Sequence, residues 1–192
     1  GADSQLMVSS NLKGVAIDLP APFGMAADVG RDTTFRMTLQ GAERRYWVNY
    51  GELANFTFAA PPGNFADGRG ELFLGGGNAV LPSAKGLRVR GVLSELDVRP
   101  WKDLVDKYAG QDPGGNAKQL LSGADFKIGK LSGVGTTLDQ ASVQLNRKPA
   151  AWALQLDSQQ VKGGASIPDA KAAPIAINLQ YVRLPAPDPT VL

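Results

Sequence analysis

Apolar and polar residues alternate with period two along most of this chain, and this pattern is typical of β-strands that have one apolar face. The alternation is clear at residues 35–40, 152–157 and 175–181. Glycine or proline separates the alternating segments, so the chain is predicted to be mainly β. The expected strands are 15–19, 35–40, 45–50, 53–60, 70–75, 87–98, 125–132, 136–146, 152–157 and 175–181.

The 23 glycines and 13 prolines indicate where the chain turns. Turns are expected at Asp67-Gly68, at residues 75–78 and at Gly163-Gly164. Within 87–98 the apolar positions change parity after Gly91, which predicts a β-bulge near that glycine.

One segment has helical rather than alternating spacing. Apolar residues at 101, 104, 105 and 108 follow Pro100, which predicts an amphipathic helix over 100–109 with Trp101 and Leu104 against the sheet. A shorter helix is possible at 117–121. The turn-rich residues 111–116 divide an N-terminal β region, 1–110, from a C-terminal one, 111–192. The predicted fold is a curved, predominantly antiparallel sheet, either an open trough or a taco-like or sandwich-like arrangement.

Composition excludes several kinds of active site. The chain has no histidine and no cysteine, which removes the usual general base, thiol chemistry and thiolate metal sites. Its four glutamates, Glu43, Glu52, Glu71 and Glu95, are expected on solvated positions. We therefore expect no enzyme activity, no metal and no cofactor. The charge is balanced at +2 without a basic run, which argues against nucleic acid as a partner.

The sequence has no apolar stretch of membrane-spanning length and no signal-like N-terminus. Two interpretations are open: the protein acts wholly in solution, or this chain is part of a longer protein anchored elsewhere.

Three stretches in order resemble the C-terminal part of the YhdP proteins, AsmA-like envelope proteins of Gram-negative bacteria. The first covers 9–24 and is similar to a family pattern S-L-x-G…L-P-x-P. The second begins at 70–76, continues through Leu81-Pro82, and matches G-L-x-V-x-G-x-L-x-x-L-D-x-x-x-W over 86–101. The third covers 152–158 with Val161, Gly163 and Ile167-Pro168. The resemblance spans nearly the whole chain.

This resemblance implies a segment of a long periplasmic protein that is tethered to the inner membrane by an N-terminal helix outside this chain. Such proteins look like bridges between the inner and outer membranes. Phospholipids would travel along an apolar groove of the bridge, and this transport would maintain the permeability barrier of the envelope. The implied partners are phospholipid acyl chains, adjoining segments of the full-length protein and other envelope proteins. The groove candidates are Val15, Ile17, Leu19, Leu72, Leu74, Leu154, Leu156, Ile175, Ile177 and Leu179.

Two other functions compete with lipid transport. A carbohydrate- or peptidoglycan-binding module would use exposed aromatic residues, for which Tyr46, Trp47 and Tyr50 are available. A purely structural module would instead bury its inward-facing aliphatic residues, with the helix at 100–109 filling the trough.

Overall fold

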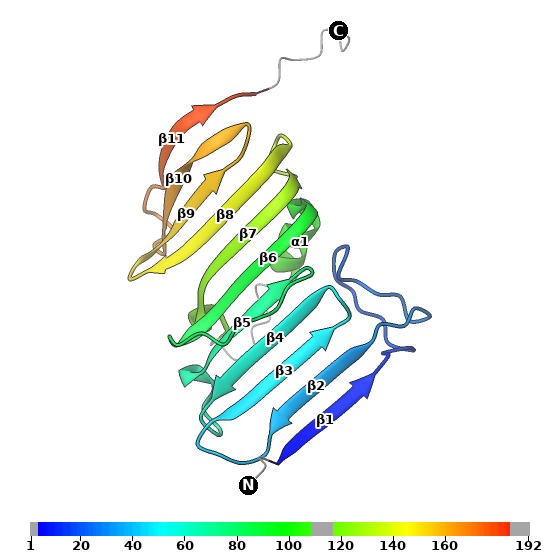
Figure 1. The fold of residues 1–192 in the computed structure, drawn as a ribbon. Helices are drawn as coiled ribbons and strands as arrows, with labels where there is room; N and C mark the ends of the chain where they lie inside the picture. Colours follow the sequence, from blue (N-terminus) through cyan, green and yellow to red (C-terminus); the bar gives the residue numbers. More distant parts are fainter. Residues whose placement is uncertain (1–3, 109–116, 185–192) are drawn as a thin grey trace.

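The described part of the chain forms one open sheet whose strands lie side by side in sequence order (Figure 1). A computed structural model describes residues 4–108 and 117–184. In these residues eleven strands are joined by two α-helices and a short 3₁₀ helix, η1. The strands are β1 (Gln5–Ser10), β2 (Thr33–Thr38), β3 (Arg44–Tyr50), β4 (Ala54–Ala60), β5 (Arg69–Leu74), β6 (Gly86–Asp97), β7 (Leu121–Ser132), β8 (Leu138–Lys148), β9 (Ala151–Asp157), β10 (Val161–Pro168) and β11 (Ala176–Val182); the helices are η1 (Phe65–Asp67), α1 (Val98–Tyr108) and α2 (Ala117–Leu120).

Neighbouring strands are antiparallel except in the middle of the sheet. There β5, β6 and β7 run parallel, which requires two crossover connections. The curved, open and predominantly antiparallel sheet predicted from the sequence is confirmed (Figure 1). The sandwich-like alternative is wrong, because the described strands form a single layer.

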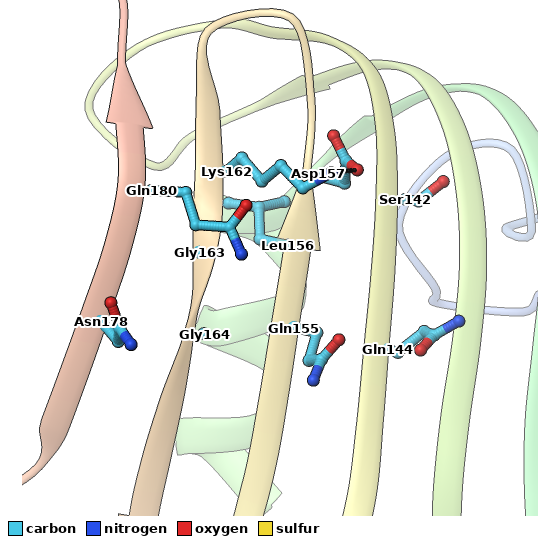
Figure 2. A pocket seen from close by; sticks show the side chains of 10 residues that line it. All are labelled: Ser142, Gln144, Gln155, Leu156, Asp157, Lys162, Gly163, Gly164, Asn178 and Gln180. Atoms are coloured by element: carbon cyan, nitrogen blue, oxygen red, sulfur yellow. Dashed lines mark ion pairs between the residues drawn. The ribbon is translucent and has the colours of Figure 1, made fainter.

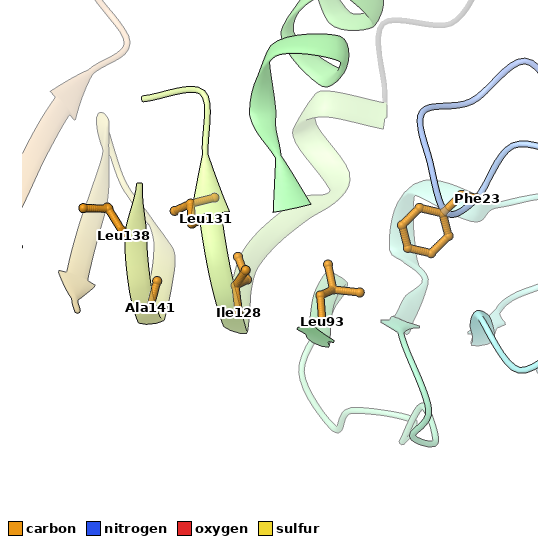
Figure 3. Packing of buried hydrophobic residues seen from close by; sticks show 6 residues of the cluster. All are labelled: Phe23, Leu93, Ile128, Leu131, Leu138 and Ala141. Atoms are coloured by element: carbon orange, nitrogen blue, oxygen red, sulfur yellow. The ribbon is translucent and has the colours of Figure 1, made fainter. Parts of the chain in front are cut away.

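The second crossover carries α1, which covers one end of one face of the sheet. Beneath it lies a group of buried side chains that we call the capped cluster. Trp101 of α1 packs on this cluster, and its ring meets Phe23 edge to face at a centroid distance of 5.8 Å. Figure 3 shows the cluster on the side of the strands where α1 and the loop with Phe23 lie. The capped cluster consists of Phe23, Leu93, Ile128, Leu131, Leu138 and Ala141.

Phe23 reaches the cluster from the long connection between β1 and β2. Its backbone carbonyl accepts hydrogen bonds from the Tyr50 hydroxyl at 2.8 Å and from the Arg31 guanidinium at 3.3 Å. The Arg31 side chain also lies over the Tyr50 ring, 4.7 Å from its centroid. These contacts hold residues 11–32 against the sheet, so that a loop residue only 3% exposed becomes part of the core.

The first crossover, residues 75–85, passes over the opposite face. The Asn55 side chain donates to the Gly77 carbonyl and accepts the N–H of Ala79. The Glu71 carboxylate accepts the N–H of Val80 at 3.0 Å. Glu71 is 3% exposed and also pairs with Arg90, so the expectation that all four glutamates are solvated is wrong for this one. Its role in the structure is to hold the crossover.

The bulge predicted near Gly91 lies three residues earlier, because the pairing of β6 with β7 shifts between Leu87 and Arg88. Val89, Gly91 and Leu93 continue the same alternation on one face, and Val92 is 57% exposed on the other. The change of parity comes at Ser94. Here the β6–β7 pairing skips Ser94 and Gly129. The two backbones approach closely, because a Cβ on Gly129 would lie 2.5 Å from the Ser94 carbonyl oxygen. Across this break, apolar positions are spaced by three on each of three strands: 93 and 96, 128 and 131, 138 and 141.

Two other strand expectations need correction. Residues 15–19 are loop, with one isolated bridge between Ile17 and Met25. Gly163-Gly164, expected as a turn, lies within β10. Strands β1 and β10 were not predicted. Both predicted helices are present, although α1 begins at Val98 rather than at residue 100. The predicted boundary at 111–116 lies outside the described residues, and the sheet continues from β6 directly to β7.

The carboxylate of Asp97 caps α1, and its loss is expected to destabilise the helix in a pH-dependent way. It accepts hydrogen bonds from the Arg99 guanidinium and, at 3.0 Å, from the Arg99 backbone N–H. These bonds hold the pKa of Asp97 below its usual 3.8. A carboxyl with a lowered folded-state pKa stabilises the fold above the unfolded-state pKa and loses that effect as the pH falls through the folded-state value.

We therefore expect Asp97→Ala to lower the melting temperature at neutral pH, and the difference from the wild type to shrink as the pH falls below 3.8. Thermal unfolding followed by circular dichroism across this range measures the effect. The exposed Glu95→Ala is the control, and an equal, pH-independent loss in both variants would contradict the capping role.

Candidate functional site: the apolar face of the sheet

The side chains on the face that carries the capped cluster are predominantly apolar. Cross-strand pairing shows this directly, because paired residues point to the same face. One continuous row crosses all eleven described strands with an apolar side chain at every position, and we call it the central row. Its members are Val8, Phe35, Val48, Phe56, Leu72, Val89, Ala124, Leu145, Leu154, Ala165 and Ile177.

None of the eleven residues of the central row is fully buried by the described part of the chain. The two ends are the most open, with Val8 50% and Ile177 67% exposed. With strands about 4.8 Å apart, ten intervals give a path of about 48 Å. That is roughly three times the thickness of one hydrocarbon leaflet of a bilayer, about 15 Å. An apolar row that the described chain leaves incompletely covered is a candidate binding site for another apolar body.

A group of rings, which includes Phe35 and Phe56 of the central row, lies across β2, β3 and β4 and reaches η1. Their centroids are 5.8 to 6.5 Å apart, in tilted and stacked arrangements. Tyr46 is central, because it contacts rings on both neighbouring strands and on η1. We call this group the aromatic cluster, and it consists of Phe35, Tyr46, Phe56, Phe58 and Phe65.

The structure brings six of the ten predicted groove residues onto this face. Leu72, Leu154 and Ile177 belong to the central row, and the next row toward α1 contains Leu74, Leu156 and Leu179. Of these, Leu74 and Leu156 pack on the capped cluster and so contribute to a closed core.

The other four predicted groove residues lie outside the strands. Ile175 precedes β11 and is 57% exposed. Val15, Ile17 and Leu19 are in the loop between β1 and β2, because their alternation reflects a small hairpin with Met25 rather than a strand of the sheet.

The opposite face is mostly polar. On each strand, the residue next to the central-row residue points to this opposite face. The row that these residues form contains Thr34, Asn49, Asn55, Arg90 and Asp125. It continues over β8–β11 with polar residues around a shallow hollow of about 400 Å³. Figure 2 shows Gln144, Gln155 and Asn178 around Gly164, with the Lys162–Asp157 ion pair at one side. The two faces of the sheet thus differ sharply in polarity.

The proposed aromatic platform for carbohydrate is divided between these faces. Tyr46 pairs with Phe58 and Tyr50 with Ala54 on the apolar face, whereas Trp47 pairs with Thr57 on the polar face. Trp47 is there covered by Arg36, whose guanidinium lies 4.4 Å from the indole centroid. The three rings therefore do not form one stacking surface.

Reasoning from the sequence missed part of the apolar face. The predicted strand at 53–60 already placed Phe56 and Phe58 on one side by alternation, so that signal was available. The contributions of β1 and β10 were not accessible in the same way, because Leu6-Met7-Val8 is a continuous apolar run and β10 contains two glycines.

Residues 4–108 and 117–184 contain no group of three or more acidic residues placed to hold a metal ion. No helix in the described residues is long and apolar enough to cross a membrane.

A family model described as YhdP protein matches residues 1–192, the whole length of the chain. No curated protein and no solved structure gives a significant match.

Proposed function

The chain belongs to the YhdP family, and on that premise we propose that it is a non-enzymatic module of a periplasmic bridge whose apolar face carries phospholipid acyl chains toward the outer membrane. The observation that carries this proposal is the central row, which is apolar at every position and is not fully buried on any of the eleven described strands.

The physical basis is the hydrophobic effect. An acyl chain that lies on the central row removes methylene groups from water, at about 0.8 kcal/mol for each group fully buried. The row is uninterrupted, so a chain can move from strand to strand without crossing a polar barrier. The headgroup stays solvated beside the sheet, and no bond is made or broken.

The test is whether the purified protein binds phospholipid on this face. Protein purified without detergent is extracted with organic solvent, and bound phospholipid is quantified by mass spectrometry. We expect about one or more phospholipids per chain, since a 48 Å row exceeds the extent of one leaflet about threefold.

A pair of variants places the lipid on one face. Leu154→Asp with Ile177→Asp adds two carboxylates to the central row on β9 and β11. Gln155→Asp with Asn178→Asp adds the same charge to the same strands on the polar face, where both residues are exposed. We expect the first variant to lose about tenfold or more of its bound lipid, because a charge cannot be buried against hydrocarbon, and the second to retain it.

Circular dichroism and thermal unfolding establish that both variants fold. Equal lipid content in the two folded variants would refute a conduit along the central row. A wild-type protein free of lipid would leave the module a structural part of the bridge.

A further inference from the structure

Two arginines interrupt the apolar face, and the contrast between them is informative. Arg147 on β8 pairs with Trp152 across the strands, and its guanidinium makes two hydrogen bonds of 2.6 Å to the Asp169 carboxylate. Arg44 lies at the start of β3, opposite Ala60. Its Nη1 atom is buried and has no hydrogen-bond partner in the described structure. Within residues 4–108 and 117–184, Arg147 has a paired carboxylate, whereas no ion pair involves Arg44.

Two carboxylates of the neighbouring segments, Glu43 and Asp67, are engaged by other cations. Glu43, its neighbour in sequence, binds the Arg69 guanidinium at 3.0 Å. Asp67, at the end of η1, pairs with Lys85. These two ion pairs use Arg69 and Lys85, so the positive charge of Arg44 is in excess over the carboxylates of Glu43 and Asp67. An unpaired buried donor on a charged group is costly, and the cost is relieved when an external anion supplies the acceptor.

The surroundings of Arg44 define which anion fits. Tyr46, two residues along β3, points to the same face and is the centre of the aromatic cluster. Val48, two residues further, belongs to the central row. At about 3.4 Å per residue, the Cα of Arg44 lies along β3 about 7 Å from the Cα of Tyr46 and about 14 Å from the Cα of Val48. An anion here would be attached to an apolar body that lies along β3.

We propose that Arg44 binds the phosphate of a phospholipid headgroup while the acyl chains of that lipid lie over the aromatic cluster and the central row. The planar guanidinium fork matches two phosphate oxygens, as arginine does at phosphate sites generally. This inference rests on the proposed function, because it assigns the headgroup position for the same lipid.

The test compares two ligands that differ only in the headgroup. Isothermal titration calorimetry measures the affinity of the intact chain for dihexanoylphosphatidylglycerol and for dihexanoylglycerol, which lacks the phosphate. Arg44→Gln is expected to weaken binding of the first ligand by about tenfold to a hundredfold, the range for a hydrogen bond to a charged group. It should leave binding of the second ligand unchanged.

Arg45→Gln is the matched control. Arg45 is adjacent in sequence and exposed, and it pairs with Ala59 on the opposite face, so its replacement removes one positive charge without touching the apolar face. Binding of both ligands should be unaffected. Equal weakening by the two variants would show a net-charge effect and overturn the assignment, as would a loss of both ligands in Arg44→Gln.

Two further measurements complete the test. Arg44→Lys keeps the charge but not the planar fork, so an intermediate affinity is expected, and this variant serves if Arg44→Gln does not fold. Inorganic phosphate that competes as strongly as the lipid would identify a free-anion site and overturn the headgroup assignment. Failure of the wild type to bind either lipid would instead refute the proposed function itself.

Discussion

Replacing Phe23 by alanine is expected to lower the free energy of unfolding by about 3–5 kcal/mol, the usual cost of removing a buried phenylalanine ring. Phe23 is 3% exposed and packs on the capped cluster, although it belongs to a connection rather than to a strand. Its removal leaves a cavity beside Trp101. Urea unfolding measures the loss as a lower midpoint with an unchanged slope.

Leu19→Ala, four residues earlier in the same connection, is the control. Leu19 is 40% exposed, so its truncation is expected to cost well under half as much. A double-mutant cycle with Trp101→Ala should show a coupling of about 0.5–1.5 kcal/mol from the edge-to-face contact. If both single-loop variants had equal stability, the connection would not be part of the core.

The second large effect is expected at Gly75, where β5 ends and the first crossover begins. Gly75 has φ +102°, and a Cβ there would lie 2.2 Å from the Val92 carbonyl oxygen on the neighbouring strand. Gly75→Ala thus combines backbone strain of about 1–3 kcal/mol with a steric conflict of similar size. We expect a total loss of about 2–6 kcal/mol in unfolding free energy.

Gly76→Ala tests this reasoning one residue further along. A Cβ on Gly76 has no atom within 4 Å, and its φ is not in the left-handed region. The variant should be close to wild type in chemical unfolding. Comparable destabilisation at both positions would mean that the crossover tolerates no side chain for another reason.

The period-two pattern predicted most of the strands because each has one face against apolar neighbours and the other in water. Where that condition fails, the prediction failed as well. Residues 15–19 alternate as a strand does, but they form a small hairpin with Met25 outside the sheet. In β1, Met7 is 62% exposed on the polar face, so the run of three apolar residues hides the alternation.

The break in β6 shows a second limit. The sequence of this strand reveals that the parity changes, but not where. The position is set by Gly129 of β7 and by Gln140 of β8, which has φ +51°. In β6, β7 and β8 the alternation of side chains between the two faces changes at the same level of the sheet. This change depends on the pairing of the three strands, so the sequence of one strand does not reveal its position.

The candidate site was predictable to a similar degree. Alternation placed Leu72, Leu154 and Ile177 on one face of their strands, and cross-strand pairing was needed to join them into a single row. The parallel order of β5, β6 and β7 fixes that row in the middle of the sheet, and the sequence carried no signal for it. That the Nη1 atom of Arg44 has no hydrogen-bond partner among the described residues is visible only in the structure, where Glu43 and Asp67 bind other cations.

The contact between Phe23 and Trp101 also has a mechanical consequence. The strands follow one another in order across the sheet, so tension applied between β1 and β11 pulls along the hydrogen bonds and loads one strand pair at a time. Such a sheet peels from its edges under low force. The contact between Phe23 and Trp101 joins the connection after β1 to the helix after β6, so it bridges the five strands from β2 to β6. Those five strands should therefore resist peeling as one unit, and extension should pause there before the sheet unfolds further.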